Sequence, residues 1–255
     1  MAAESPSTNP KVLVCDTDAL IQIFIAHQGE LLKRLKRRYG IQPVIPESVE
    51  AEITRRGHPK SAVILPSVTK ALDNGALLVL EERVIGAFTS NDAHSTYTSI
   101  QLMGQDNAMR IGQGEAYAYA AGVILKAPIL SNDASAVKIA DRFGIKQPPF
   151  ILRAYDLFML FHQNDELGER DCDNIRQSLL AAGEALPFQV RNKSYRDGLA
   201  HIYPRVIDDD YTLIANGKPS ELGDLNQLVI KSPRPQSGNT PIEDAPPEAR
   251  EAPTE

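Results

Sequence analysis

Short, continuous apolar runs alternate with helical segments along residues 11–163, and this alternation limits the fold more than any other feature of the chain. Runs of this kind are typical of strands buried on both faces, as in a parallel sheet with helices on each side. The sequence therefore predicts an α/β fold, a three-layer α/β/α sandwich with a parallel sheet of about four or five strands. The expected strands are residues 11–15, 43–45, 76–80, 127–130 and 149–152.

Helical periodicity fills most of the intervals between these strands. Thr17 and Asp18 are predicted to cap the first helix, and Gly40 is predicted to end the second. Residues 86–111 are polar with weak periodicity, and one helix near residues 97–103 is a hypothesis only. The expected helices cover residues 20–25, 29–39, 46–56, 66–75, 114–125, 134–143, 154–163 and 168–183.

Composition divides the chain into four parts. We expect a flexible N-terminus over residues 1–10, one α/β domain over 11–165, a helical and irregular extension over 166–231 and a disordered tail over 232–255. The tail is rich in Pro, Ser, Glu and Thr, a composition that buries too little apolar surface to fold.

Charge and cysteine content limit the class of protein. The net charge of −6 and the pI of about 5.5 argue against a protein that coats nucleic acid by bulk charge. Cys15 lies in an apolar run, as a small buried hydrophobic residue does. A disulfide between Cys15 and Cys172 is an open alternative, but two cysteines do not suggest the disulfide framework of a secreted protein. With no visible targeting segment and no run near the roughly 20 apolar residues of a membrane helix, we expect a cytoplasmic protein without membrane contact.

Four acidic residues are expected at one edge of the predicted sheet. Asp16 directly follows the first strand, and Asp133 follows the fourth after Ser131 and Asn132. Open parallel sheets bind ligands at the carboxyl ends of their strands, so these two carboxylates meet if the strands are neighbours. Glu52 lies beside the apolar face of its helix, and Glu115 begins a helix rich in small residues.

Each of these acids also has an ordinary structural explanation. Asp16 and Asp133 are placed to cap helices, Glu115 complements the dipole of its own helix, and Glu52 could be solvated. Their common location favours a second interpretation. Two like charges 4 Å apart repel by roughly 4 kcal/mol at an effective dielectric constant of 20, so a shared pocket requires a cation. Oxygen ligands suit Mg²⁺ or Mn²⁺, which can activate water for phosphodiester hydrolysis.

The segments around these acids resemble the motifs of the PIN-domain nucleases, a family that includes the VapC-like ribonucleases. The third segment, with Gly114-Glu115-Ala116, is similar to the Gly-Glu-Ala branch of that family. In the fourth, Ser131 precedes the last aspartate as a Ser or Thr does in the family. In chain order the four segments are residues 12–20, 44–53, 112–118 and 129–133, and their acids are Asp16, Glu52, Glu115 and Asp133.

This resemblance covers residues 11–163 and implies a function. It implies a PIN-like nuclease domain over residues 11–165 that hydrolyses RNA as an endoribonuclease. The four acids would be the catalytic and metal-binding residues for Mg²⁺ or Mn²⁺. It also implies a toxin whose partner is an antitoxin protein. A homodimer is a further implication of the resemblance. Residues 81–111 and those after 163 are not explained by the motifs.

Several other polar residues are candidates with a less specific signal. Thr17, Ser131 and Asn132 could orient ligands or water, although helix capping explains them equally well. Arg55, Arg56 and Lys60 follow Glu52 and are candidates for substrate binding. The basic run over residues 33–38 could contact a phosphate backbone, but a solvated helix face is the commoner reason for such a run.

Two alternatives to the ribonuclease hypothesis stay open. The acidic pI and the long additional segments would suit a PIN-fold binding or scaffold protein with little catalysis. A DNA nuclease or a phosphatase could use the same ligands, because metal ligands contact phosphate and water and not the 2′-hydroxyl that distinguishes RNA.

Overall fold

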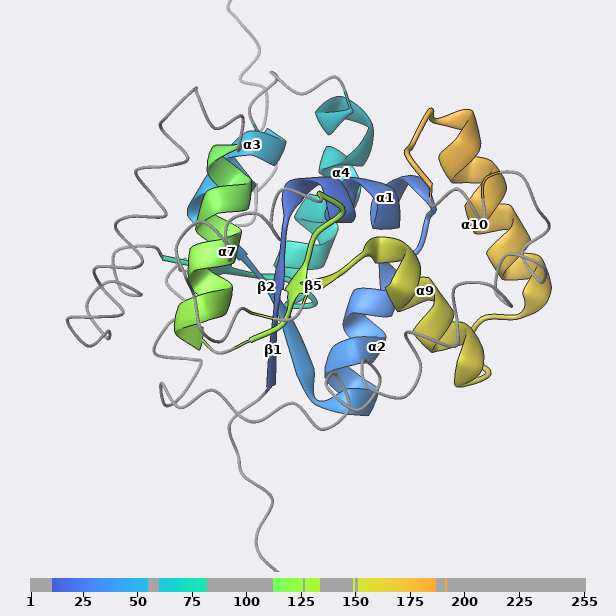
Figure 1. Ribbon diagram of the computed structural model, residues 1–255, viewed down its shortest axis with the longest axis horizontal. Coiled ribbons are helices and arrows are strands. Elements are labelled where there is room, and N and C mark those ends of the chain that lie inside the picture. Colours follow the sequence, from blue (N-terminus) through green and yellow to red (C-terminus); the bar gives the residue numbers. More distant parts are fainter. Residues whose placement is uncertain are drawn as a thin grey trace, which may run out of the picture.

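The described strands form a single parallel sheet (Figure 1). The structure is a computed structural model that describes residues 11–54, 60–81, 112–125, 127–133, 149, 151–186 and 191. The sheet order is β3-β2-β1-β4-β5, so the predicted α/β class and the parallel sheet are confirmed. The strands are β1 (Lys11–Cys15), β2 (Ile41–Pro46), β3 (Leu78–Leu80), β4 (Ile129–Leu130) and β5 (Ile151–Leu152).

Strand β1 lies at the centre of the sheet, and its residues explain why. Leu13, Val14 and Cys15 are fully buried, as expected of a strand with helices against both faces. Cys15 pairs with Leu130 of β4, so these two strands end side by side. The expected first strand is confirmed to the residue. The strands expected over residues 76–80 and 127–130 are also present, but β3 and β4 are shorter than these apolar runs. The carboxyl ends of β1 and β4 therefore lie next to each other at one edge of the sheet.

Seven helices surround the sheet within the described residues. Figure 1 shows α7 on one side of the strands and α2 with α9 on the other. Helix α7 contacts β1, β2 and β4, while α10 packs on α1 and α9. None of the described helices is both long and apolar enough to span a bilayer. The helices are α1 (Thr17–Ile25), α2 (Glu30–Tyr39), α3 (Glu47–Thr54), α4 (Ser61–Asp73), α7 (Gln113–Leu125), α9 (Ala154–Gln163) and α10 (Glu169–Ala181).

Two predicted helix starts are wrong. The cap of α1 is Asp16 rather than Thr17 or Asp18, because Asp16 has extended backbone angles and its carboxylate accepts the Thr17 amide. Helix α4 begins at Ser61 instead of residue 66, with Pro66 inside it. Pro66 is exposed, and the apolar face of α4 is buried on either side of it, so packing outweighs the hydrogen bond that proline removes.

Several sequence predictions fall on residues outside the described ranges. These include the N-terminus 1–10, the hypothetical helix near 97–103, the helix expected over 134–143 and the tail 232–255. The predicted end of the third helix at Arg56 also lies outside them, because the described part of α3 ends at Thr54.

Close packing of α7 on β4 depends on a glycine. A Cβ atom at Gly122 would lie 2.5 Å from Cγ1 of Ile129 and 3.3 Å from the Ala127 carbonyl oxygen. We expect Gly122→Ala to lower the free energy of unfolding by roughly 1–3 kcal/mol, measured by urea denaturation, because the helix must move away from the strand. Gly112→Ala is the matched control, since its Cβ would meet nothing within 4 Å. Equal urea midpoints for the two variants would contradict this packing.

Candidate functional site

Asp16 is held at the carboxyl end of β1 by two hydrogen bonds. Its Oδ1 accepts from the Thr17 amide at 2.7 Å, and its Oδ2 accepts from Oγ of Ser131 at 2.9 Å. The side chain is buried, with 4% of Asp16 exposed. The capping interpretation of Asp16 is therefore correct, but capping uses one oxygen, and the other reaches the end of β4.

The surroundings of Asp16 oppose its ionisation. The pKa of the Asp16 carboxyl is raised from the ordinary 3.8 to about 7, mainly by burial and in part by the negative charges of Asp18 and Glu115. The hydrogen bonds from Ser131 and the Thr17 amide lower this pKa but do not compensate for burial. A cation next to Asp16 would favour the ionised form and reverse the penalty. The predicted ligands are all carboxylates, which suits Mg²⁺ or Mn²⁺.

Glu52 joins three helices at the same edge of the sheet. From α3, its Oε2 accepts from Oγ1 of Thr17 at 2.6 Å, and its Oε1 accepts from the Gly114 amide at 2.8 Å. A Cβ atom at Gly114 would lie 2.5–2.8 Å from the carboxylate atoms of Glu52, so only glycine leaves room for this approach. The motif glycine thus has a geometric reason: it allows α7 to contact the Glu52 carboxylate.

Glu115 follows that glycine in the first turn of α7. It is buried, with 7% exposed, and its charge acts on Asp16 by raising the pKa of that carboxyl. The predicted dipole role also applies, because Glu115 lies at the helix start. The two acids Asp16 and Glu115, which are distant in sequence, are therefore electrostatically coupled in the fold.

Asp133 reaches this edge through its backbone. Its amide donates to Oγ of Ser131 at 3.3 Å, and Ser131 in turn donates to Asp16. The side chain of Asp133 is exposed. Asn132 ties the same turn to two helices, since its Nδ2 donates to the Asp18 carbonyl at 3.2 Å and its Oδ1 accepts from the Ala154 amide at 3.0 Å.

The four predicted acids therefore come from segments that contact one another, but they do not form a closed ligand shell. Hydrogen bonds connect the Asp16 segment to those of Glu52 and Asp133, and the Glu52 carboxylate contacts the residue that precedes Glu115. In the part of the chain that the structure describes, no three His, Cys, Asp or Glu side chains gather closely enough to bind one metal ion. Thr17 and Ser131 donate hydrogen bonds to Glu52 and Asp16, and their role in orienting ligands or water stays a prediction.

The basic candidates are largely engaged with the protein itself. Lys60 forms an ion pair with Glu184, which also accepts a hydrogen bond from Gln22. Arg55 and Arg56 lie outside the described residues. In the basic run, Arg34 and Arg38 pair with Glu166, and Lys36 donates to the Gly75 carbonyl. Most of this run thus joins α2 to neighbouring segments.

Sequence reasoning passed over one buried acid. Glu50 of α3 is 4% exposed and is more buried than Glu52, which is half-buried. The signal was present, because Glu50 precedes Ile53 by three residues and so shares the buried helix face of Val49 and Ile53.

Comparisons with protein-family models, curated proteins and solved structures were made for the whole chain. No family model, no curated protein and no solved structure matches it.

Proposed function

We propose that the chain is a metal-dependent endoribonuclease in which Asp16, Glu52, Glu115 and Asp133 hold Mg²⁺ or Mn²⁺. One observation carries the proposal: Asp16, a buried carboxylate with a raised pKa, lies at the carboxyl edge of the sheet beside the segments of the other three acids. It accepts a hydrogen bond from Ser131 and is electrostatically coupled to Glu115, while the adjacent Thr17 donates to Glu52. Perturbed carboxyl groups gathered at a ligand-binding edge are typical of functional sites.

The finer description of the fold belongs to the same proposal. We infer a three-layer α/β/α sandwich of the PIN type, supported by the order of the four motif segments and by the helices on both sides of the parallel sheet. A homodimer and an antitoxin partner follow from the resemblance, and a cytoplasmic location follows from the cysteine content. All three are part of the proposal.

The residues of this chain have distinct tasks in the proposed site. Ser131 fixes one oxygen of Asp16 while the Thr17 amide fixes the other, so the carboxylate has one orientation. Thr17 and Gly114 hold Glu52 in the same way. A bound divalent ion would lower the pKa of a water molecule and stabilise the leaving oxygen of a phosphodiester. Rigid positioning of this kind is what hydrolysis by in-line attack requires.

A substrate panel tests the function. Wild-type protein is incubated with RNA, single-stranded DNA and a small phosphoester, each with Mn²⁺ and with a chelator. We expect cleavage of RNA that needs Mn²⁺ and is abolished by Asp16→Asn. Asp73→Asn, which changes an exposed carboxylate at the end of α4, is the matched control and should cleave at the wild-type rate. Wild-type rates from Asp16→Asn would refute the assignment.

Two other functions are outcomes of the same panel. A PIN-fold binding protein with weak catalysis is favoured by the open arrangement of the acids, in which Glu52 is satisfied by Thr17 and Gly114. It predicts no Mn²⁺-dependent cleavage of any substrate. A DNA nuclease or a phosphatase predicts the same dependence on Asp16 with a different preferred substrate.

A further inference from the structure

A groove of about 180 Å³ lies between α4, the end of α1 and the start of α2, away from the four acids. The α4 residues that line it are Ser67, Lys70 and Ala71, followed by Asn74 just after the helix. They follow helical spacing, so they form one stripe about 10 Å long at a rise of 1.5 Å per residue. The buried Phe24 and Ala76 provide apolar surface along the groove.

The groove offers hydrogen-bond donors and an excess of positive charge. Lys70 is exposed, and within the described part of the chain no acidic side chain forms an ion pair with it. Asn74 uses its Oδ1 to accept the Ala76 amide at 3.0 Å, which leaves its Nδ2 as a donor. Lys33 and Glu30 also line the groove and pair with each other at 3.6 Å. Of the two lysines that line the groove, Lys70 is therefore the one that forms no ion pair with an acidic side chain of the described residues.

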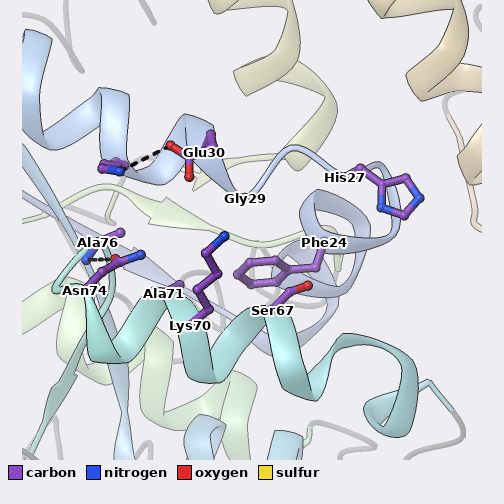
Figure 2. A pocket seen from close by; sticks show the side chains of 10 residues that line it. Phe24, His27, Gly29, Glu30, Ser67, Lys70, Ala71, Asn74 and Ala76 are labelled. Carbon is purple, nitrogen blue, oxygen red and sulfur yellow. Dashed lines mark hydrogen bonds and ion pairs between the residues drawn. The ribbon is translucent and has the colours of Figure 1, made fainter.

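The placement of Lys70 fits this role. Figure 2 shows its side chain rising from α4 toward the start of α2, beside the ring of Phe24. Helix α2 begins there at Glu30, and its N-cap residue Gly29 provides no side-chain cap, so the positive end of the helix adds to the field. The ring of Phe24 gives the groove an apolar wall beside this exposed lysine.

We propose that this groove binds a phosphate group, with Lys70 as its principal cation and Asn74 and Ser67 as neighbouring donors. Lysine binds phosphate as a point charge, and an amide and a hydroxyl on the same helix face offer neutral hydrogen bonds. Glu30 is the competing anion of the site, because its carboxylate neutralises Lys33. The proposal is independent of the proposed cleavage. The phosphate group has two sources, inorganic phosphate in solution and the backbone of an RNA chain.

The test uses calorimetric titration of the full chain with inorganic phosphate and, separately, with a short single-stranded RNA, both in a chelator that prevents cleavage. We expect Lys70→Met to weaken binding about tenfold, the loss of one charge-assisted hydrogen bond. Glu30→Gln should strengthen binding, because it removes the competing carboxylate. Arg37→Met is the control, since it removes one positive charge from an exposed position of α2 that does not line the groove.

The two probes separate the sources of phosphate. If Lys70→Met weakens the binding of inorganic phosphate and Glu30→Gln strengthens it, the ligand is a free phosphate. If the two variants have these effects on RNA binding alone, the ligand is a phosphodiester. Affinities that are equal for wild-type protein and Lys70→Met with both probes would overturn the proposal. So would an equal loss in Arg37→Met, which would show an effect of net charge and not of the groove.

Discussion

Replacing Asp16 with asparagine should stabilise the protein at neutral and higher pH while abolishing RNA cleavage. The folded protein holds the Asp16 proton with a pKa of about 7, compared with the ordinary 3.8. The folded state binds this proton more tightly than the unfolded chain does. Ionisation of Asp16 therefore destabilises the fold progressively as the pH rises from about 3.8 to about 7. The full cost is present above about pH 7 and is on the order of 4 kcal/mol.

Asparagine separates the charge of Asp16 from its structural role. It retains an oxygen that can cap α1, and it is neutral at every pH. In metal-free buffer we expect urea unfolding to give similar free energies for wild-type protein and Asp16→Asn near pH 4, with the variant more stable at about pH 8. Asp73→Asn should show no such divergence. If Asp16→Asn is less stable than wild type at the higher pH, burial of the ionised Asp16 carboxylate does not destabilise the fold.

Gly114→Ala should reduce cleavage about a hundredfold without unfolding the protein, because a displacement of about 1 Å at a catalytic group has an effect of that size. The new Cβ atom would overlap the Glu52 carboxylate at 2.5–2.8 Å, so the side chain of Glu52 must rotate away. Its hydrogen bonds with Thr17 and the Gly114 amide would be disturbed. Alanine is otherwise well tolerated in a helix.

Two comparisons make this second prediction specific. Gly112→Ala changes a nearby glycine whose Cβ would meet nothing within 4 Å, and it should cleave like wild type. In a Glu52→Ala background, Gly114→Ala should have little further effect, because the group that it displaces is gone. Additive losses in this double-mutant cycle, measured as kcat/KM with RNA, would show that Gly114 acts by another route.

The parallel sheet could be predicted from sequence because its signal is local. Continuous apolar runs such as Lys11–Cys15 belong to strands buried on both faces, and β1 was placed to the residue. Asp16 could be located for the same reason, since it directly follows that strand. The start of α4 could not, because Pro66 is a strong local signal that tertiary packing overrides.

Contacts between distant segments lie beyond what periodicity can predict. The ion pair of Lys60 with Glu184 joins residues far apart in sequence, and no local pattern distinguishes a lysine that binds substrate from one that binds a glutamate. The approach of Gly114 to Glu52 is similar in kind, although the small residues of α7 indicated close packing. Helix spacing and the motif resemblance directed the prediction to Glu52, although Glu50 shares the buried helix face of Val49 and Ile53 and is the more buried acid.

Direct titration with Mn²⁺ at about pH 8, where Asp16 is largely ionised, tests the central claim that the gathered carboxylates share a divalent ion. Calorimetry on the full chain should show saturable binding that is lost in Asp16→Asn, strongly weakened in Glu115→Gln and unchanged in Asp73→Asn. Wild-type protein that binds no Mn²⁺, or an Asp16→Asn variant that binds it as tightly as wild type does, would contradict the account.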